Sequence, residues 1–137
     1  MASRSLDDLH PKLRNLAKTF KKICLREGVP VLIYMTYRSN EDQDELYAQG
    51  RTKPGNIVTN VKGGKSDHNF TLNGKPASLA FDAVPIRKTD NGDALIWNDP
   101  NLWAKMGDIA QEIGLKWGGN WKKFVDKPHF YIELKES

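Results

Sequence analysis

The residues best suited to binding a catalytic metal are two histidines and one aspartate that lie far apart in the sequence. The chain has three histidines, and His10, which precedes a proline near the N-terminus, is the one for which we expect no functional role. His68 lies in a polar segment flanked by glycines, and His129 begins the alternating segment HFYIEL. Asp82 is embedded in the apolar run SLAFDAV, where a carboxylate is costly unless it is paired or binds a metal. Two histidines and one carboxylate are a ligand set of catalytic zinc, which keeps its fourth position for water.

The spacing of these three residues alone leaves two interpretations open. In the first they bind zinc together. In the second Asp82 is hydrogen-bonded within the core and the two histidines are unrelated to it. The choice depends on the secondary structure that positions the three side chains and on further motifs in the chain.

The first part of the chain predicts two helices with a buried strand between them. Apolar residues recur at helical spacing over residues 13–24, and Gly28 ends that helix. Residues 30–38 are apolar and β-branched, which is typical of a buried strand. Ser39 resembles the first residue of a capping box and predicts a short helix that Gly50 ends.

The middle of the chain predicts a long loop, a hairpin and a connection. Residues 51–67 contain glycines and a proline without a sustained period, and loops of that length are usually functional or disordered. Asn73 and Gly74 lie between two alternating arms, which is a strong signal for a β-hairpin. Residues 85–99 show no strand period, and we expect another connection there.

The last part of the chain predicts a helix and a final strand. Asp99 followed by Pro100 is typical of a helix start, and the helical period continues to Gly114. The alternating residues 130–134 predict the final strand. Helices and strands are mixed without a regular βαβ repeat, which favours an α+β fold with helices packed on an antiparallel sheet. We expect one small domain over residues 1–137.

The composition is that of a soluble domain with a basic surface. The net charge is +4 and the sequence pI is about 9.2, which favours polyanions such as anionic cell-wall polymers. Nucleic-acid binding has no support beyond this charge, and we do not expect it. Cys24 is the single cysteine, which excludes an internal disulfide and a multi-cysteine metal site. Its place on the apolar face of the first helix predicts a buried thiol.

Three motifs resemble those of a known family. The run TYRSNEDQDELYAQGRTKPGNIVTNVKGGKSDHNF, followed by LAFD and then by WGGNWKKFVDKPHF, closely resembles the L-alanyl-D-glutamate peptidases of phage endolysins and bacterial cell-wall hydrolases. These enzymes belong to the zinc peptidase group that includes the D-Ala-D-Ala carboxypeptidases. The matching segments span residues 31–134 and occur in the order expected for the family.

The resemblance implies a zinc site in a cleft, with one Zn²⁺ per chain. The Ser-x-His motif implies His68 as the first ligand, and the Ala-x-Asp motif implies Asp82 as the second. The histidine of the PHF segment, His129, is the implied third ligand. Trp117, Trp121 and Tyr37 are candidates for the walls of the cleft, although large aromatic residues are more often part of a core.

The resemblance also implies the remaining residues of the site. Asp126, three residues before the last ligand, is the implied general base, with Glu133 as a weaker candidate. Arg38 is expected to face the scissile carbonyl or a substrate carboxylate. Ser66 and Gln43 are assigned to substrate binding; Ser66 alternatively orients the first ligand, and Gln43 alternatively holds Arg38 in place.

One departure from the family pattern concerns the second ligand. Asp82 follows His68 by fourteen residues, which is more than in the family's motif Ser-x-His-x-x-Gly-x-Ala-x-Asp. The simplest account is an insertion over residues 71–77 that forms the predicted hairpin, and we expect it on the rim of the cleft, in contact with substrate. Asp67 and Asp90 are poorer candidates for this ligand, because Asp67 points away if its neighbour points in, and Asp90 lies in a polar loop.

The resemblance implies a zinc metallopeptidase that hydrolyses the L-Ala–D-Glu bond of peptidoglycan stem peptides. A D,D- or L,D-carboxypeptidase on the same scaffold is the close alternative, and a non-catalytic wall-binding module is the more distant one. No apolar run approaches the ~18 residues of a membrane span, and no signal peptide is visible. We therefore expect a protein made in the cytoplasm and active in the periplasm or cell wall. It would be a phage-type or prophage-type lytic enzyme released through a holin, or part of a bacterial lysis or secretion cassette. We also expect a monomer.

Overall fold

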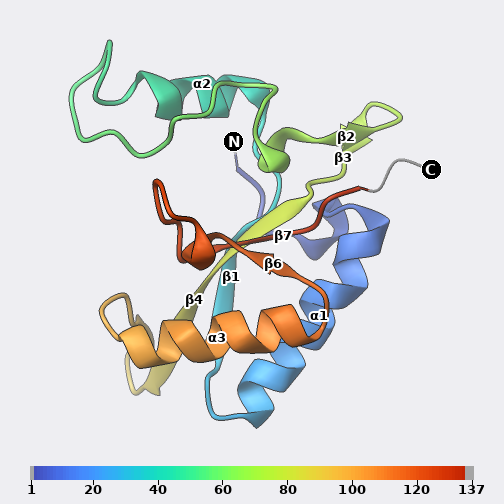
Figure 1. Cartoon of the computed structure of the whole chain (residues 1–137), viewed down its shortest axis with the longest axis vertical. Coiled ribbons are helices and arrows are strands. Elements are labelled where there is room, and N and C mark those ends of the chain that lie inside the picture. The colour runs from blue at the N-terminus through green and yellow to red at the C-terminus, as the bar shows by residue number, and fades with distance from the viewer. Residues whose placement is uncertain (1, 135–137) are drawn as a thin grey trace.

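A five-stranded antiparallel sheet forms the centre of the protein (Figure 1). The computed structural model describes residues 2–134. The strands follow the order β1-β4-β7-β6, and β5 pairs with the far end of β4. Their bounds are β1 Val31–Met35, β4 Ala80–Thr89, β5 Gly92–Leu95, β6 Lys116–Trp117 and β7 His129–Tyr131. The sheet and its helices confirm the predicted α+β class.

Two helices cover one face of this sheet. These are α1 (Pro11–Arg26) and α3 (Pro100–Glu112), and Asp99 caps α3 by accepting hydrogen bonds from two backbone amides of its first turn. The ring of Phe20 on α1 lies 5.6 Å from that of Phe81 on β4 and 4.9 Å from that of Phe130 on β7. All three side chains are fully buried, so the core lies between these helices and the sheet. Cys24 is also fully buried here, and burial raises the pKa of its thiol to about 12, which confirms the structural role.

The shorter helix α2 (Asn40–Ala48) and the loop after it lie at the end of the molecule opposite α3 (Figure 1). Ser39 caps α2 by accepting a hydrogen bond from the amide of Asp42, as its motif predicts. Residues 51–66 form the predicted long loop, which contains no helix or regular strand. No helix among the described residues is long and apolar enough to cross a membrane.

The sheet register places polar residues on the face away from α1 and α3. Phe81 pairs with Phe130 in the register of β4 and β7, and the next pair is Asp82 with His129. Successive side chains of a strand point to opposite faces. Because the phenylalanine pair points into the core, the Asp82–His129 pair points to the other face.

The prediction for residues 85–99 is wrong. Strand β4 continues through Pro85 to Thr89, and β5 returns beside it after a two-residue turn before Gly92. Proline cannot donate a hydrogen bond to a ladder. The carbonyl of Pro85 accepts one from the amide of Ile96, and pairing at this position needs no donor from the proline. The outer residues of this hairpin are exposed and show no apolar alternation to reveal them.

The last strand also differs slightly from the prediction, because β7 ends at Tyr131 rather than at residue 134. The predicted hairpin is confirmed. Strands β2 (Thr71–Leu72) and β3 (Lys75–Pro76) pair antiparallel, and Asn73 and Gly74 between them both have positive φ, at 55° and 77°. That conformation is the one the Asn-Gly pair favours.

Candidate functional site

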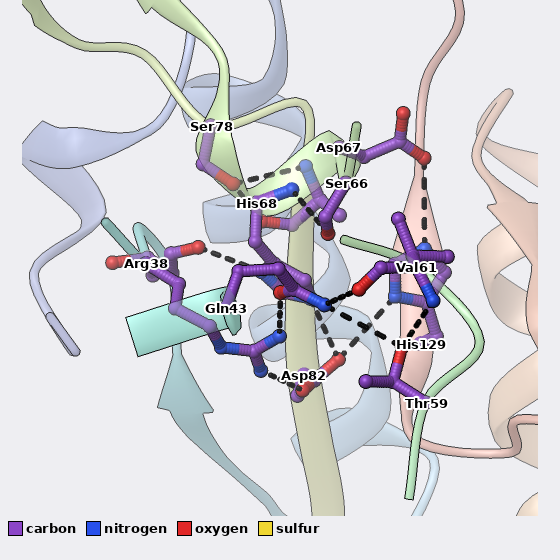
Figure 2. Close-up of polar contacts among 12 residues, drawn as sticks. Arg38, Gln43, Thr59, Val61, Ser66, Asp67, His68, Ser78, Asp82 and His129 are labelled. Carbon is purple, nitrogen blue, oxygen red and sulfur yellow. Dashed lines mark hydrogen bonds and ion pairs between the residues drawn. The ribbon is translucent and has the colours of Figure 1, made fainter. Parts of the chain in front are cut away.

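Three potential metal ligands meet on the polar face of the sheet, as Figure 2 shows. The register of β4 and β7 brings Asp82 and His129 side by side, and their Oδ1 and Nδ1 atoms are 3.5 Å apart. His68 comes from the short 3-10 turn η2 (Asp67–Asn69), and its Nε2 lies 3.2 Å from the same Asp82 Oδ1. Each residue offers one ligand atom, and all three atoms lie within 4.8 Å of one another.

The turn η2 is fixed from both sides, which positions His68. The hydroxyl of Ser66 accepts a hydrogen bond from the backbone amide of His68, and the side-chain oxygen of Asn69 accepts from the amides of Gly64 and Ser66. The side-chain amide of Asn69 in turn donates to the carbonyl of Arg38. The sequence KGGKSDHN therefore encodes a capped turn attached to the segment after β1. Of the two roles expected for Ser66, the structure shows contact with the backbone of His68.

The orientation of the His68 imidazole follows from one backbone contact. Its Nδ1 lies 2.8 Å from the carbonyl oxygen of Thr36, a buried residue just after β1. A carbonyl can only accept, so Nδ1 carries a proton, and Nε2, on the side of Asp82, is the ring nitrogen that is left for a metal. A partner of this kind on the other ring nitrogen is the usual arrangement of a metal-binding histidine.

His129 has an equivalent partner that the sequence did not reveal. Its Nε2 lies 3.7 Å from Asp67 Oδ2, while its Nδ1 faces Asp82 (Figure 2). As we expected, the side chain of Asp67 points away from that of His68. It points instead toward His129. The sequence made Asp67 a poor candidate for a ligand and did not reveal this contact, because η2 and β7 come together only in the folded structure.

The charges of these groups are strongly coupled. Burial lowers the pKa of His129, but the carboxylates of Asp67, Asp82 and Asp126 outweigh burial and raise it to about 9. Burial raises the pKa of Asp82, but the two histidines outweigh burial and hold that pKa well below its usual range. A cation that binds here must therefore displace a proton from His129.

The three residues fit a zinc ion by type and by spacing. Ligand atoms around a tetrahedral zinc, at bonds of about 2.0–2.2 Å, lie about 3.3–3.6 Å from one another. The separations of 3.2 Å and 3.5 Å from Asp82 Oδ1 to the two histidine nitrogens are close to these values. Two imidazoles and a carboxylate oxygen thus converge on one nearly buried point, which is a ligand set that zinc uses.

Asp126 lies one turn before His129 and lines the same cleft. The amide of His129 donates to the carbonyl of Asp126, which closes the turn DKPH at 3.2 Å. Gly118 makes this possible, because a Cβ atom there would lie 2.4 Å from the carbonyl oxygen of Asp126. Burial, followed by the neighbouring charge of Asp82, raises the pKa of Asp126 above its usual range. The motif WGGNW thus allows the close approach of two segments that the site requires.

Arg38 is held beside Asp82 by a buried hydrogen bond. Its Nη1 donates to Gln43 Oε1 at 2.6 Å, and its Nη2 lies 3.9 Å from Asp82 Oδ2. The side-chain amide of Gln43 also donates to the carbonyl of Val61, which ties the long loop to α2. Gln43 is only 1% exposed. Its contact with Arg38 fits the second of its two expected roles, which is to hold Arg38 in place.

A cleft of about 490 Å³ opens above these groups. The three ligand candidates line this cleft together with Asp126, Arg38, Ser66 and Gln43, which are the seven site residues predicted from the sequence. Its lining also includes Asp67, Trp121, Phe124 and residues 58–61 of the long loop. The ring of Trp121 lies 5.2 Å from that of His129, so Trp121 forms part of the wall. Tyr37 and Trp117 do not line the cleft, and the ring of Trp117 stacks on Phe130 in the core.

Comparisons with known proteins agree with this site. Residues 59–132, which contain the three ligand candidates and Asp126, match the family described as D-alanyl-D-alanine carboxypeptidase. The chain is also 40% identical over 130 residues to the peptidoglycan L-alanyl-D-glutamate endopeptidase CwlK of Bacillus subtilis (strain 168). That match covers 89% of this chain and 72% of CwlK. The chain belongs to this family of peptidases.

Two further proteins are similar to this peptidase. The L-alanyl-D-glutamate peptidase of Listeria phage A118 is 27% identical over 136 residues, which is 97% of this chain and 42% of the phage protein. The chain therefore spans less than half of that relative. The crystal structure of the Serratia marcescens L-Ala D-Glu endopeptidase ChiX matches with a TM-score of 0.64 and 23% identity, over 97% of this chain and 89% of that one. This likeness shows that the fold is shared.

The contact between Asp67 and His129 leads to a prediction about metal affinity. Asp67→Asn should weaken zinc binding by about 10- to 100-fold, because the carboxylate that orients the ring and increases its basicity is lost. Competition with a chelator of known affinity measures this directly. Asp108→Asn, which changes an exposed carboxylate on α3, should leave the affinity unchanged. Equal affinities of Asp67→Asn and the unaltered peptidase would rule out the role of Asp67.

The β2–β3 hairpin does not take the position we expected. No residue of 71–77 lines the cleft, so the expectation that the insertion lies on its rim is wrong. The hairpin leaves the site through Phe70 and returns at Ala77, whose amide donates to the carbonyl of Phe70. From there Ser78 pairs with the N-terminal segment at Leu9, which directs the hairpin away from the cleft.

This geometry predicts that the hairpin can be shortened. Replacing residues 71–76 with a minimal turn should preserve zinc stoichiometry and change turnover of a soluble peptide by no more than about twofold, because these residues are exposed. Metal analysis and peptide kinetics on the same preparation measure both quantities. Loss of zinc from a variant that keeps its circular dichroism would mean that the hairpin holds Asp82 in place.

Proposed function

We propose that this peptidase is a zinc-dependent endopeptidase that hydrolyses the L-Ala–D-Glu bond of peptidoglycan stem peptides. The observation that carries the proposal is the convergence of His68, Asp82 and His129 in one cleft with Asp126. The choice of bond is supported by CwlK, whose name is that of an L-alanyl-D-glutamate endopeptidase.

The roles of the residues follow from their positions. His68, Asp82 and His129 would hold one zinc ion, which when bound polarises a carbonyl and lowers the pKa of water to about 7. Asp126 is partly buried in the same cleft with a raised pKa, which suits a group that accepts a proton from water and returns it to the leaving amine. The hydrogen bond between its backbone and His129 fixes its distance from the ligands.

Arg38 is the residue that we assign to the developing negative charge. Arg38 lines the cleft, and its Nη2 lies 3.9 Å from Asp82 Oδ2, beyond hydrogen-bond distance, so this nitrogen can still donate to a group that enters the site. The hydrogen bond from Nη1 to Gln43 fixes the position of the guanidinium. A donor that is already in place when charge develops needs no reorganisation. Ser66 supports the same site by capping the turn that carries His68.

The remaining parts of the proposal concern partners and location. The basic surface is compatible with anionic wall polymers as additional partners. The site of action would be the peptidoglycan of the periplasm or cell wall. Release through a holin and a monomeric state remain predictions.

The test is the analysis of fragments from purified peptidoglycan digested with and without a chelator. New amino-terminal D-Glu that disappears with the chelator would support the proposal. The matching family is described as D-alanyl-D-alanine carboxypeptidase, so release of free D-Ala would point to that alternative. Binding to the wall without any new fragment would point to a non-catalytic module.

A further inference from the structure

A second cavity adjoins the catalytic cleft. It has a volume of about 340 Å³ and is lined by Trp97, Trp103, Val125, Asp126, Lys127 and Pro128. This volume lies at the lower end of the range for small-molecule sites. Asp126 lines both spaces. The cavity and the cleft are therefore neighbours on either side of the proposed general base.

Trp97 forms an exposed aromatic wall of this cavity. It is 46% exposed, and Val125 opposite it in the lining is 50% exposed, so water covers a large apolar surface here. Large exposed apolar surface next to a cleft is typical of a binding site.

The backbone and the ring of Trp97 both contact neighbouring residues. The indole of Trp103 donates to the carbonyl of Trp97 at 2.9 Å, and the two rings lie 6.1 Å apart. Tyr34, which lines the catalytic cleft, also packs edge-on against Trp97 at 5.8 Å. These contacts restrict Trp97 while the residue stays 46% exposed, so a ligand that binds to the ring costs little conformational entropy.

The indole N–H of Trp97 is also unused. The chain has four tryptophans, and Trp103, Trp117 and Trp121 each donate to an acceptor in the protein. Within residues 2–134, Trp97 donates to no protein group in the structure. A flat apolar ring with a free donor at its edge suits a ligand that has an apolar face and polar substituents around it, which describes a pyranose ring.

The position of this cavity matches the chemistry of the proposed substrate. In peptidoglycan the amino group of L-Ala is acylated by the lactyl group of a muramic acid, so a sugar lies on the acyl side of the scissile bond. The L-Ala and lactyl units together span roughly 7 Å when extended. A cavity separated from the cleft by one residue, Asp126, is within that reach.

We infer that this cavity is a subsite for the muramic acid of the glycan strand, with Trp97 as its stacking platform. The inference rests on the proposed function, since it assigns the sugar that carries the stem peptide. Trp97 touches neither the metal ligands nor the reacting bond, so it would contribute to substrate affinity and specificity rather than to the chemical step.

The test compares two substrates that share the scissile bond. One is an N-acetylated stem peptide, and the other is the same peptide attached to the disaccharide of the glycan strand. Trp97→Ala should lower kcat/KM for the sugar-bearing substrate by about tenfold, in line with the loss of one aromatic contact. The same variant should change kcat/KM for the acetylated peptide by no more than about twofold. Trp97→Phe should keep most of the unaltered kcat/KM for the sugar-bearing substrate. Leu25→Ala, at an exposed site on α1, should leave kcat/KM unchanged for both substrates.

Equal losses on both substrates, or no loss on either, would overturn the subsite. A second measurement uses the unaltered chain and the disaccharide without any peptide. The indole N–H resonance of Trp97 should shift on titration while those of the other three tryptophans stay in place, and an unmoved Trp97 resonance would contradict the inference. Because this titration needs no hydrolysis, failure of the proposed bond cleavage remains distinguishable from failure of the subsite.

Discussion

Replacing His129 by alanine should reduce bound zinc from one ion per chain to near zero and abolish peptidoglycan hydrolysis. The ring supplies one of three protein ligands, and its Nδ1 lies 3.5 Å from Asp82. His68→Ala should have the same effect, because the second imidazole faces the same carboxylate oxygen at 3.2 Å. Metal analysis of the purified variants, with circular dichroism to confirm folding, measures the result. In the unaltered chain zinc binding should weaken as pH falls, because a ligating imidazole must be neutral.

Asp90→Ala is the matched control for these ligand variants. Asp90 was a weaker candidate for the second ligand, and it lies exposed in the turn between β4 and β5. It should retain one zinc per chain and full activity. A folded His129→Ala variant that retained stoichiometric zinc would remove His129 from the ligand set.

Asp126→Asn should keep its zinc and lose about 10²–10⁴ in turnover, the range expected for a missing general base. The amide keeps the size of the side chain and leaves the backbone hydrogen bond to His129 intact, so the ligands should stay in place. Turnover of a soluble stem peptide, compared at equal zinc content, isolates the role of the carboxylate.

Glu133→Gln provides the control for Asp126. Glu133 was the weaker candidate for the base, but its carboxylate pairs with Lys116 at 3.3 Å, is 64% exposed, and does not line the cleft. This variant should keep its turnover. Normal turnover of Asp126→Asn, measured at full zinc content, would mean that another group accepts the proton.

Most elements of the fold could be predicted from local signals in the sequence. The helical period of residues 13–24, the caps at Ser39 and Asp99, and the Asn73-Gly74 turn are each encoded within a few residues. The pairing of Asp82 with His129 could not be derived in this way, because a register between strands that are far apart in the sequence depends on the whole core. For that pairing the family motifs supplied what local patterns could not.

The features that could not be predicted from the sequence share a physical cause. Apart from Ile86, the hairpin after Pro85 is exposed on both arms, so no apolar alternation marks it. The contact of Asp67 with His129, and the cavity beside Trp97, arise where separate segments meet in space. Residues of this kind can be found only once the strands and turns have been placed.

The measurement that tests the central claim most directly is a crystal structure of the zinc-loaded protein with anomalous diffraction at the zinc edge. One peak should lie between His68 Nε2, Asp82 and His129 Nδ1, because Thr36 and Asp67 occupy the other two ring nitrogens. Asp126 should be close to the metal without coordinating it. A zinc peak elsewhere, or zinc bound through His129 Nε2 with Asp67 displaced, would contradict the arrangement that we derive.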